Sequence, residues 1–159
     1  MTIYFYKAWQ PYGCFSNFSP HGIVIQKTYW STVEHYYQAQ KFVGTKDEII
    51  IPLIHDAETP EKAAELGRCP TRQIRPDWEV IKTIVMGTAV LQKFRTHTGI
   101  AKILLDTGEQ LLVENSPTDY FWGCGANKSG QNQLGKTLMS VRSELRHMPV
   151  LEALAKSNS

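Results

Sequence analysis

The stretch FWGCGANKSGQNQLGKTLM, residues 121–139, places four glycines and several side-chain amides between a tryptophan and a helix-like apolar stripe. Glycine lets the backbone adopt positive φ values or approach a ligand closely, at an entropic cost in folding. One interpretation is an ordinary loop that leads into a helix. The other is a pocket wall, in which Trp122 and the backbone around Gly123 meet a planar, polar ligand.

The composition indicates one globular domain. The chain has 159 residues, 42% of them hydrophobic and 20% charged, which excludes a disordered chain and allows a substantial core. The formal net charge of +2 is too small to indicate nucleic-acid binding by itself. The sequence contains neither a signal-peptide pattern nor an apolar run long enough for a membrane span. Three widely separated cysteines are typical of a reducing compartment, so we expect a cytoplasmic protein.

The apolar periodicity predicts a helix-rich α+β fold. Helices are expected at residues 31–42, 59–67, 76–95, 98–106 and from 134 until Pro149. Short strands are expected at residues 3–6, 22–25, 28–30 and 111–114, the second and third as a hairpin. Because strands and helices do not alternate regularly, we expect a compact single domain around a small β-sheet. This domain is predicted to span residues 1–148, followed by a tail at 149–159.

The helix at residues 31–42 carries the most suggestive polar stripe. Ser31 and Glu34 have the spacing of a capping box, while Glu34, Gln38 and Lys41 share one helix face. Glu34 can therefore be a capping residue, a carboxylate that faces a cleft, or both. Lys41 can be a solvated helix lysine, or an amine that pairs with a phosphate or attacks a carbonyl carbon.

Other patterns bound the chemistry. A tryptophan such as Trp122 beside bare backbone can stack on a base, which is worth roughly 1–3 kcal/mol, although a core tryptophan is the commoner case. Cys124 lies in the glycine-rich stretch without a nucleophile motif around it. No P-loop, GxGxxG, HExxH or CxxC pattern occurs, so we expect neither a cofactor nor a metal site, and activity that is insensitive to chelators.

Five segments occur in an order that identifies a family. They are GCFSNFSP (13–20), STVEHYYQAQKF (31–42), GRCPTRQIRPDWEVIKTIVM (67–86), LVENSPTDYFWGCG (112–125) and GQNQLGKTLMSVR (130–142). In these segments the chain resembles the NADAR family, also described as YbiA-like or RibX-like, from residue 3 to about 147. The resemblance implies a helix-rich α+β fold and N-glycosidase chemistry. Family members are associated with phosphoribosylated intermediates of riboflavin biosynthesis, or with removal of ADP-ribose from guanine in nucleic acids.

The resemblance also implies roles for particular residues. Glu34 matches the family's essential carboxylate, and Trp78 and Trp122 match its pocket tryptophans. The full set of candidate catalytic residues is Glu34, Lys41, Lys82 and Asp119, and the candidate substrate-binding residues are Asn17, Arg68, Trp78, Trp122, Gly123 and Asn132. Some members carry an acidic residue where this chain has Cys124. If that acid assists catalysis in those members, this chain either lacks the corresponding group or uses Asp119 in its place.

The chemistry of N-ribosyl cleavage fits these residue types. Positive charge builds on C1 of the ribose, where a fixed carboxylate can stabilise it and activate water. In a variant mechanism, Lys41 or Lys82 captures C1 as an imine. Phosphate could be held by Arg68, Arg75, Lys128 and the backbone of residues 123–130.

Two other functions remain open. The protein could be a non-catalytic reader of ADP-ribose or a related nucleotide, with Glu34 as a helix cap only, or a thiol enzyme that uses Cys124. The expected partner is a nucleotide-sugar or an ADP-ribosylated nucleic acid, and no membrane. The sequence does not decide between the substrates, and it leaves the oligomeric state open.

Overall fold

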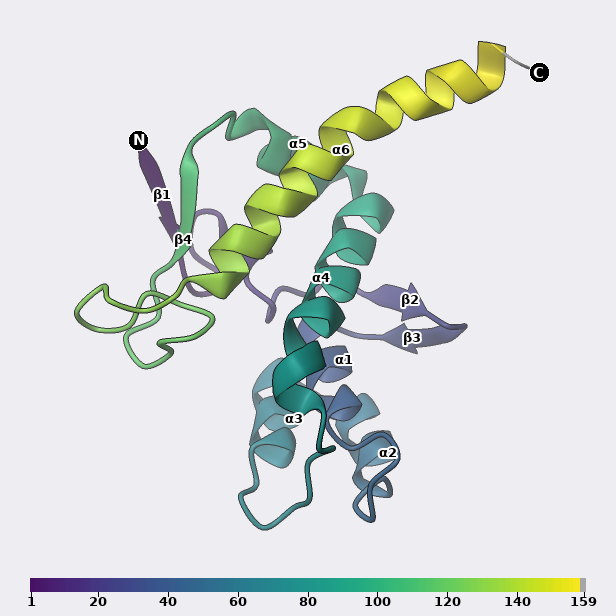
Figure 1. The fold of residues 1–159 in the computed structure, drawn as a ribbon, viewed down its shortest axis with the longest axis vertical. Coiled ribbons are helices and arrows are strands. Elements are labelled where there is room, and N and C mark those ends of the chain that lie inside the picture. The colour runs from purple at the N-terminus through teal and green to yellow at the C-terminus, as the bar shows by residue number, and fades with distance from the viewer. Residues whose placement is uncertain (158–159) are drawn as a thin grey trace.

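A computed structural model describes the backbone of residues 1–157 and the surroundings of the side chains of residues 1–148. The elements follow in the order β1 (Thr2–Phe5), a 3₁₀ turn η1 (Gly13–Phe15), β2 (Ile23–Ile25), β3 (Thr28–Trp30), α1 (Val33–Gln40), α2 (Ile50–His55), α3 (Pro60–Gly67), α4 (Trp78–Thr96), α5 (Thr98–Asp106), β4 (Leu111–Glu114) and α6 (Gln133–Ser157). Together they form the compact, helix-rich α+β domain that the sequence predicts (Figure 1).

The strands form two small sheets where the sequence predicts one. β1 and β4 pair in parallel, with Phe5 opposite Glu114, while β2 and β3 form an antiparallel hairpin. The predicted hairpin is therefore confirmed. Its two turn residues, Gln26 and Lys27, have φ values of 50° and 66°. This left-handed conformation matches the twist of a two-residue hairpin, and it is usually supplied by Asn-Gly.

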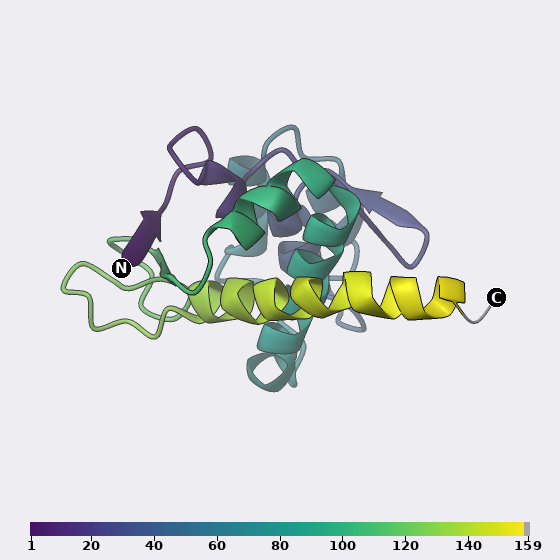
Figure 2. The ribbon, with the colours of Figure 1, turned by 90° about the horizontal axis from the view of Figure 1, so that it is seen from above.

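Helix α4 occupies the centre of the domain. It contacts α1, α5, α6 and β2, and Figures 1 and 2 show α6 crossing it with β1 and β4 at one end of α6. Met86, Val90 and Phe94 on α4 are buried, and Leu112 of β4 and Leu134 of α6 belong to the same core. The core thus joins both ends of the chain to the central helix.

Two predictions about helices need correction. The apolar run at residues 49–54 contains α2, which the sequence analysis leaves unassigned, and Ile50 and Ile54 are buried on its inner face. The prediction that Pro149 ends the last helix is wrong, because α6 continues to Ser157. A proline removes one bond of the helical ladder. Residues 151–156 are all strong helix formers, which favours resumption of the helix beyond it.

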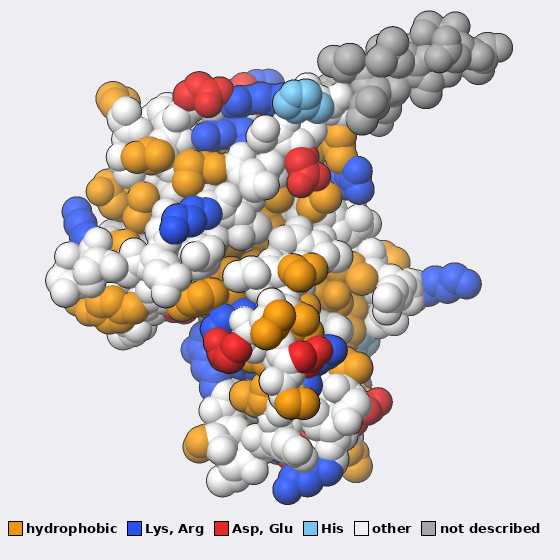
Figure 3. Space-filling model, viewed as in Figure 1, with side chains coloured by type: hydrophobic (Ala, Val, Ile, Leu, Met, Phe, Trp, Pro, Cys, Tyr) orange, Lys and Arg blue, Asp and Glu red, His pale blue; other side chains and the backbone are white. Residues whose placement is uncertain are grey.

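The stripe of α6 is confirmed, since Leu134, Leu138, Val141 and Leu145 are all buried. The side chains of the predicted tail at 149–159 lie outside the described residues, so the boundary of that tail stays a prediction. Within the described chain, no helix combines the length and apolarity that crossing a membrane requires. On the face seen in Figure 3, basic and acidic side chains are interspersed among hydrophobic ones.

Candidate active site

Helix α1 begins one residue later than a capping box at Ser31 requires. Thr32 is the N-cap, and its hydroxyl accepts the backbone N–H of His35 at 3.2 Å. The predicted capping box of Ser31 with Glu34 is therefore wrong, because the N–H that is capped lies three residues after Thr32. The carboxylate of Glu34 points elsewhere, so its position is not explained by capping.

Glu34 is buried, with 4% of its surface exposed, yet it lines a cavity. Its Oε1 accepts the side-chain N–H of Gln38, one helical turn on, at 2.7 Å, and a guanidinium nitrogen of Arg68 lies 3.9 Å away. Burial raises the pKa of Glu34, while the Gln38 hydrogen bond and the charges of Arg68 and Lys41 oppose the increase. A buried carboxylate that keeps a single hydrogen-bond donor can respond strongly to a positive charge beside it.

Lys41 completes the polar stripe of α1. Its ammonium group is buried, donates to the carbonyl of Gly67 at 3.4 Å and lies 5.8 Å from the ring centre of Tyr37. Burial lowers its pKa to about 8, although the charge of Glu34 acts in the opposite direction. About a tenth of such an amine is neutral at pH 7, far more than of a solvated lysine.

The segment before β2 supplies a second wall. The backbone N–H of Glu34 donates to the carbonyl of Asn17 at 3.2 Å, which ties this segment to the start of α1. Asn17 is buried and lines the cavity, and its Oδ1 has no hydrogen-bond partner. Behind this wall, the fully buried Lys93 of α4 donates to the carbonyl of Ser16 at 2.9 Å.

The end of β4 and the loop after it supply the third wall. Asp119 Oδ1 accepts the backbone N–H groups of Phe121 and Trp122 at 2.9 and 2.7 Å, so the loop itself fixes this carboxylate. The indole N–H of Trp122 donates to the hydroxyl of Tyr37 at 3.1 Å. Glu114, the last residue of β4, lies on the same wall.

These walls enclose an inner cavity of about 160 Å³ that opens into an outer cleft of about 750 Å³. The inner cavity is lined by Ser16, Asn17, Phe18, Glu34, Tyr37, Gln38, Lys41, Arg68, Met86, Glu114, Asp119 and Trp122. The outer cleft is lined by Tyr6, Lys7, Ala8, Trp9, Ser16, Phe18, Pro60, Glu61, Arg68, Glu114, Ser116, Thr118, Asp119, Tyr120 and Phe121. The two spaces share five residues and so form one continuous site. Its inner end suits a small polar group, and its outer end has the volume of typical ligand pockets.

Six of the predicted site residues meet at the inner cavity: Asn17, Glu34, Lys41, Arg68, Asp119 and Trp122. Trp78 does not line it. Trp78 is buried behind the cavity wall, with its ring centre 5.0 Å from that of Tyr37. The ring of Tyr37 in turn contacts that of Trp122, which does line the cavity. Lys82 also lies outside the lining, where it pairs with Glu79 at 2.6 Å. Between the two candidate lysines, the geometry therefore favours Lys41.

The glycine-rich stretch packs on itself and presents little free backbone to the site. The N–H groups of residues 130–134 all donate to carbonyls of residues 120–124, at 2.8 to 3.0 Å. A Cβ on Gly130 would lie 2.4 Å from the carbonyl oxygen of Gly123, and one on Gly123 would lie 2.8 Å from Ser116 Cβ. The glycines therefore permit backbone to meet backbone. No residue of the segment 123–130 lines the inner cavity or the outer cleft, so the expectation that its backbone holds phosphate finds no support.

Asn132 belongs to this packing as well. Its side chain accepts the backbone N–H of Glu114 at 3.0 Å and donates to the carbonyl of Leu112 at 2.9 Å. Both polar atoms of the amide are thus used to hold β4. The side chain is absent from the cavity lining, which does not favour its predicted role in substrate binding.

The remaining candidates lie elsewhere. Arg75 pairs with Asp77, and the ammonium of Lys128 lies 4.9 Å from the ring centre of Tyr4, so neither lines the cavity or the cleft. Cys124 is buried and its Sγ lies 3.6 Å from Asn115 Oδ1, also outside both spaces. A thiol that no substrate can reach does not support the thiol-enzyme interpretation. Among the side chains described, no group of three or more His, Cys, Asp or Glu residues is arranged to hold a metal ion.

A comparison with known families decides the identity of the fold. The NADAR domain matches residues 4–146, which is most of the chain. This chain belongs to the NADAR domain family. The resemblance predicted from the five ordered segments is thereby confirmed.

Relatives of this NADAR domain match nine-tenths or more of the chain. An N-glycosidase of Nostoc punctiforme is 74% identical over 148 residues, which cover 93% of this chain and 95% of that protein. The NMR structure of Escherichia coli YbiA is similar, with a TM-score of 0.85 and 38% identity, covering 94% of this chain and 87% of that one. The maize chloroplastic riboflavin biosynthesis protein PYRR is 46% identical over 157 residues, but these cover only 25% of that protein.

Sequence reasoning missed three side chains that line or support the candidate site of this NADAR domain. Glu114 faces both spaces of the site, Tyr37 joins Trp122 to Trp78, and Lys93 supports the wall at Ser16. The sequence offered one signal for Glu114, which is the acid at the end of an apolar strand. The carboxyl ends of strands are common places for binding sites. No comparable signal marks Lys93, since a lysine on a long helix is normally solvated.

Proposed function

We propose that this protein is an N-glycosidase that hydrolyses the bond between a ribose C1 and a base nitrogen. The observation that carries the proposal is the buried carboxylate of Glu34 at the inner end of the cavity, beside a buried lysine. Relatives that cover nearly all of this chain are named N-glycosidases, which supports the same class of reaction.

The reaction requires stabilisation of positive charge. As the C1–N bond breaks, its electron pair leaves with the base, and positive charge spreads over C1 and the ring oxygen. The Glu34 carboxylate has a single hydrogen-bond donor, Gln38 Nε2, and can stabilise that charge or accept a proton from the attacking water. The water adds its hydroxyl to C1, and the base departs with one proton.

Lys41 offers a second route to the same products. Its neutral fraction at pH 7 is raised by burial, so the amine can bond to C1 as the C1–N bond breaks, and the base leaves with the proton that the amine gives up. The ring C1–O bond then opens to give an imine, which water hydrolyses to the free sugar and the amine. Lys82 is less suited to this step because it lies outside the cavity, with its ammonium paired to Glu79 and 3.9 Å from the ring centre of Phe121. We therefore assign the imine variant, where it operates, to Lys41.

The two spaces of the site suit two different parts of the substrate. The inner cavity takes the ribose, since Asn17 Oδ1 is a buried acceptor without a partner and sugar hydroxyls are donors. The outer cleft takes the base or a second nucleotide, because Tyr6, Trp9 and Tyr120 offer ring faces there. Trp122 contacts the inner end, so its predicted stacking would involve the part of the substrate that lies there.

Two substrates fit this division. A phosphoribosylated intermediate of riboflavin biosynthesis is the first, and it is supported by the names of the maize relative and of a Vibrio vulnificus relative with 41% identity. ADP-ribosyl-guanine in nucleic acid is the second, favoured by an outer cleft that is larger than one base requires. Both carry a ribose with a phosphate on C5.

The test measures cleavage of the N-ribosyl bond by the purified protein, as release of ADP-ribose from an ADP-ribosyl-guanine oligonucleotide and as release of the nitrogen leaving group from the phosphoribosylated intermediate. Glu34→Gln keeps the shape of the side chain and removes its charge, and Glu58→Gln is the matched control, because Glu58 is exposed and lines neither the inner cavity nor the outer cleft. Cleavage by the wild type and by Glu58→Gln, but not by Glu34→Gln, is expected. Binding of ADP-ribose without cleavage of either substrate would instead identify a reader.

A further inference from the structure

Glu114 stands where the inner cavity meets the outer cleft, since it lines both. Its backbone is held on both sides: the N–H donates to Asn132 Oδ1 at 3.0 Å, and the carbonyl accepts the N–H of Cys124 at 2.9 Å. Its position is therefore fixed by β4 and by the glycine-rich stretch. If the ribose lies in the inner cavity and the base in the outer cleft, as proposed, the bond between them lies beside Glu114.

The carboxyl group of Glu114 has no partner within the protein. Its Oε2 is buried and makes no hydrogen bond, although buried polar atoms are nearly always paired. Asn17 Oδ1, in another wall of the inner cavity, is likewise buried without a hydrogen-bond partner. An unpaired buried oxygen that faces a cavity indicates a group that meets its partner in the ligand.

We propose that Glu114 is the catalytic acid, which donates its proton to the nitrogen of the departing base. The inference rests on the proposed N-glycosidase function and names the second carboxyl group of that reaction. The O–H bond of Glu114 breaks as the C1–N bond breaks, and the base leaves as a neutral molecule. Water then supplies the hydroxyl to C1, and its remaining proton passes by way of Glu34 and solvent to restore Glu114.

The surroundings of the two glutamates separate their roles. Burial raises the pKa of Glu34 and the charge of Asp119 adds to the increase, but the Gln38 hydrogen bond and the charges of Arg68 and Lys41 favour its ionised form. Glu114 receives no hydrogen bond and faces the anions Asp119 and Glu34. Carboxyl groups that share one site cannot all ionise, so the proton rests on the group with the fewest donors.

The ionisation of Glu114 supports the same assignment. Burial, followed by the charges of Asp119 and Glu34, raises its pKa to about 8, while Arg68 acts in the opposite direction. Other charged and titratable groups line the site from four segments. They are Tyr6 and Lys7 after β1; Glu34, Tyr37 and Lys41 on or after α1; Glu61 and Arg68 on or after α3; and Asp119 and Tyr120 after β4. Because the acid is protonated below pH 8, it can act as a donor at neutral pH.

The experiment compares two leaving groups. Release of the leaving group is measured for the natural substrate identified above and for 4-nitrophenyl riboside 5′-phosphate, whose leaving group, 4-nitrophenolate, departs without a proton. For Glu114→Gln we expect a loss of about 10²–10⁴-fold in kcat on the natural substrate and less than about threefold on the nitrophenyl compound. Glu58→Gln, at an exposed residue that lines neither space, serves as control for both substrates, and the cooperative urea unfolding of each variant establishes that it folds.

The pH profile gives a second readout. In the wild type, kcat/KM on the natural substrate should fall as pH rises through about 8, and Glu114→Gln should lack this alkaline limb. Equal losses on both substrates, an unchanged rate on the natural substrate, or an alkaline limb that persists in Glu114→Gln would each overturn the assignment. If the wild type releases no base at all, the N-glycosidase proposal fails, and the role of Glu114 fails with it. If the wild type and Glu114→Gln are equally active, only the assignment of Glu114 as the acid fails, and the N-glycosidase proposal stands.

Discussion

The buried ammonium of Lys93 should make the stability of this protein depend on pH in a way that one substitution can remove. Lys93 is 1% exposed, and its hydrogen bond to the Ser16 carbonyl connects the central helix to the cavity wall. Burial lowers its pKa from 10.5 to about 7, with only the nearby Cys14 acting in the opposite direction. The folded state therefore disfavours the charged form, which the unfolded state accepts freely.

The magnitude follows from this difference in pKa. Each pKa unit corresponds to about 1.36 kcal/mol, so keeping a charge at Lys93 costs the folded state about 5 kcal/mol. Below pH 7 the lysine is charged in both states and the cost is fully present. Between pH 7 and 10.5 the unfolded state binds more protons than the folded state. The free energy of unfolding therefore rises with pH across this window.

Lys93→Met keeps the length of the side chain and removes the charge. At pH 6.5 it should raise the free energy of unfolding by about 2–4 kcal/mol, after about 1–3 kcal/mol is subtracted for the unpaired Ser16 carbonyl. At pH 10, which is still below the unfolded pKa of 10.5, about 1 kcal/mol of the charge cost remains, so the same substitution should lower the free energy of unfolding by about 0–2 kcal/mol through the lost hydrogen bond.

Urea unfolding of both proteins at pH 6.5, 8 and 10 measures these differences. Subtracting the two curves removes the contribution of groups that do not interact with Lys93. The curves retain the coupling of Lys93 with Cys14 and His21, whose pKa values the charge of Lys93 lowers. A difference in free energy that keeps one value and one sign at all three pH values would refute the reasoning. It would mean that Lys93 is not held in its neutral form by burial.

Three further outcomes are expected. Trp9, 76% exposed on the outer cleft, should contribute stacking worth about 1–3 kcal/mol, so Trp9→Ala should raise KM about 5–150-fold with kcat little changed, and an unchanged KM would remove it from the substrate site. Asn132→Ala should lower the free energy of unfolding by about 2–4 kcal/mol, measured in urea, because two bonds to β4 are lost; a change below 1 kcal/mol would contradict this account. Cyanoborohydride should trap a covalent sugar adduct, detected by mass, in the wild type and in Lys82→Arg but not in Lys41→Arg, with more adduct as pH rises through about 8; no adduct in any protein would exclude the imine.

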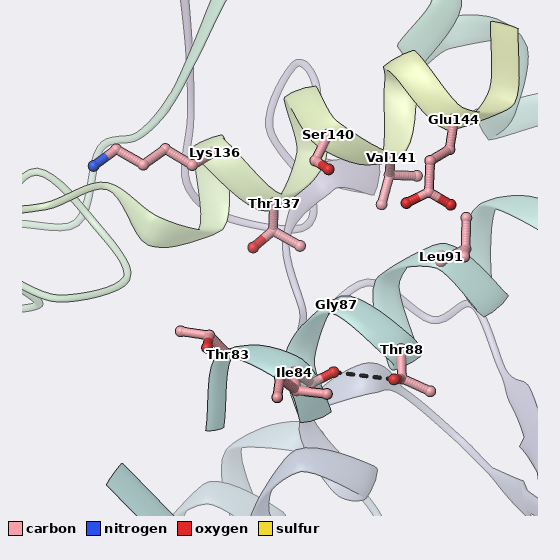
Figure 4. A pocket seen from close by; sticks show the side chains of 10 residues that line it. All are labelled: Thr83, Ile84, Gly87, Thr88, Leu91, Lys136, Thr137, Ser140, Val141 and Glu144. Atoms are coloured by element: carbon pink, nitrogen blue, oxygen red, sulfur yellow. Dashed lines mark hydrogen bonds between the residues drawn. The ribbon is translucent and has the colours of Figure 1, made fainter. Parts of the chain in front are cut away.

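A groove between α4 and α6 lies apart from the proposed site. It has about 450 Å³, smaller than the outer cleft but larger than the inner cavity, and Figure 4 shows side chains of the two helices facing each other across it. Ile84, Thr88 and Leu91 lie on one side, and Thr137 and Val141 on the other. It shares no lining residue with the inner cavity or the outer cleft. The inner cavity is therefore identified by the chemistry of its lining, and not by its volume.

Local patterns in the sequence determined much of this protein. The 3.6-residue periodicity located the long helices, Gln26 and Lys27 lay between two strand-like runs that do form a hairpin, and the order of five segments identified the family. Glu34 and Lys41 could be placed on one face of α1, because their spacing fixes their relative direction. These features depend on neighbours within about two helical turns, which a sequence displays directly.

Tertiary structure decided which polar groups meet. Residues 5 and 114 become neighbours through the parallel pairing of β1 with β4, and this pairing brings Glu114 to a cavity that α1 also lines. Packing placed Trp78 behind Tyr37 and consumed the backbone N–H groups of residues 130–134 in bonds to residues 120–124. Residue type alone could not reveal this. Whether a tryptophan or a backbone N–H faces a ligand depends on contacts between segments that are distant along the chain.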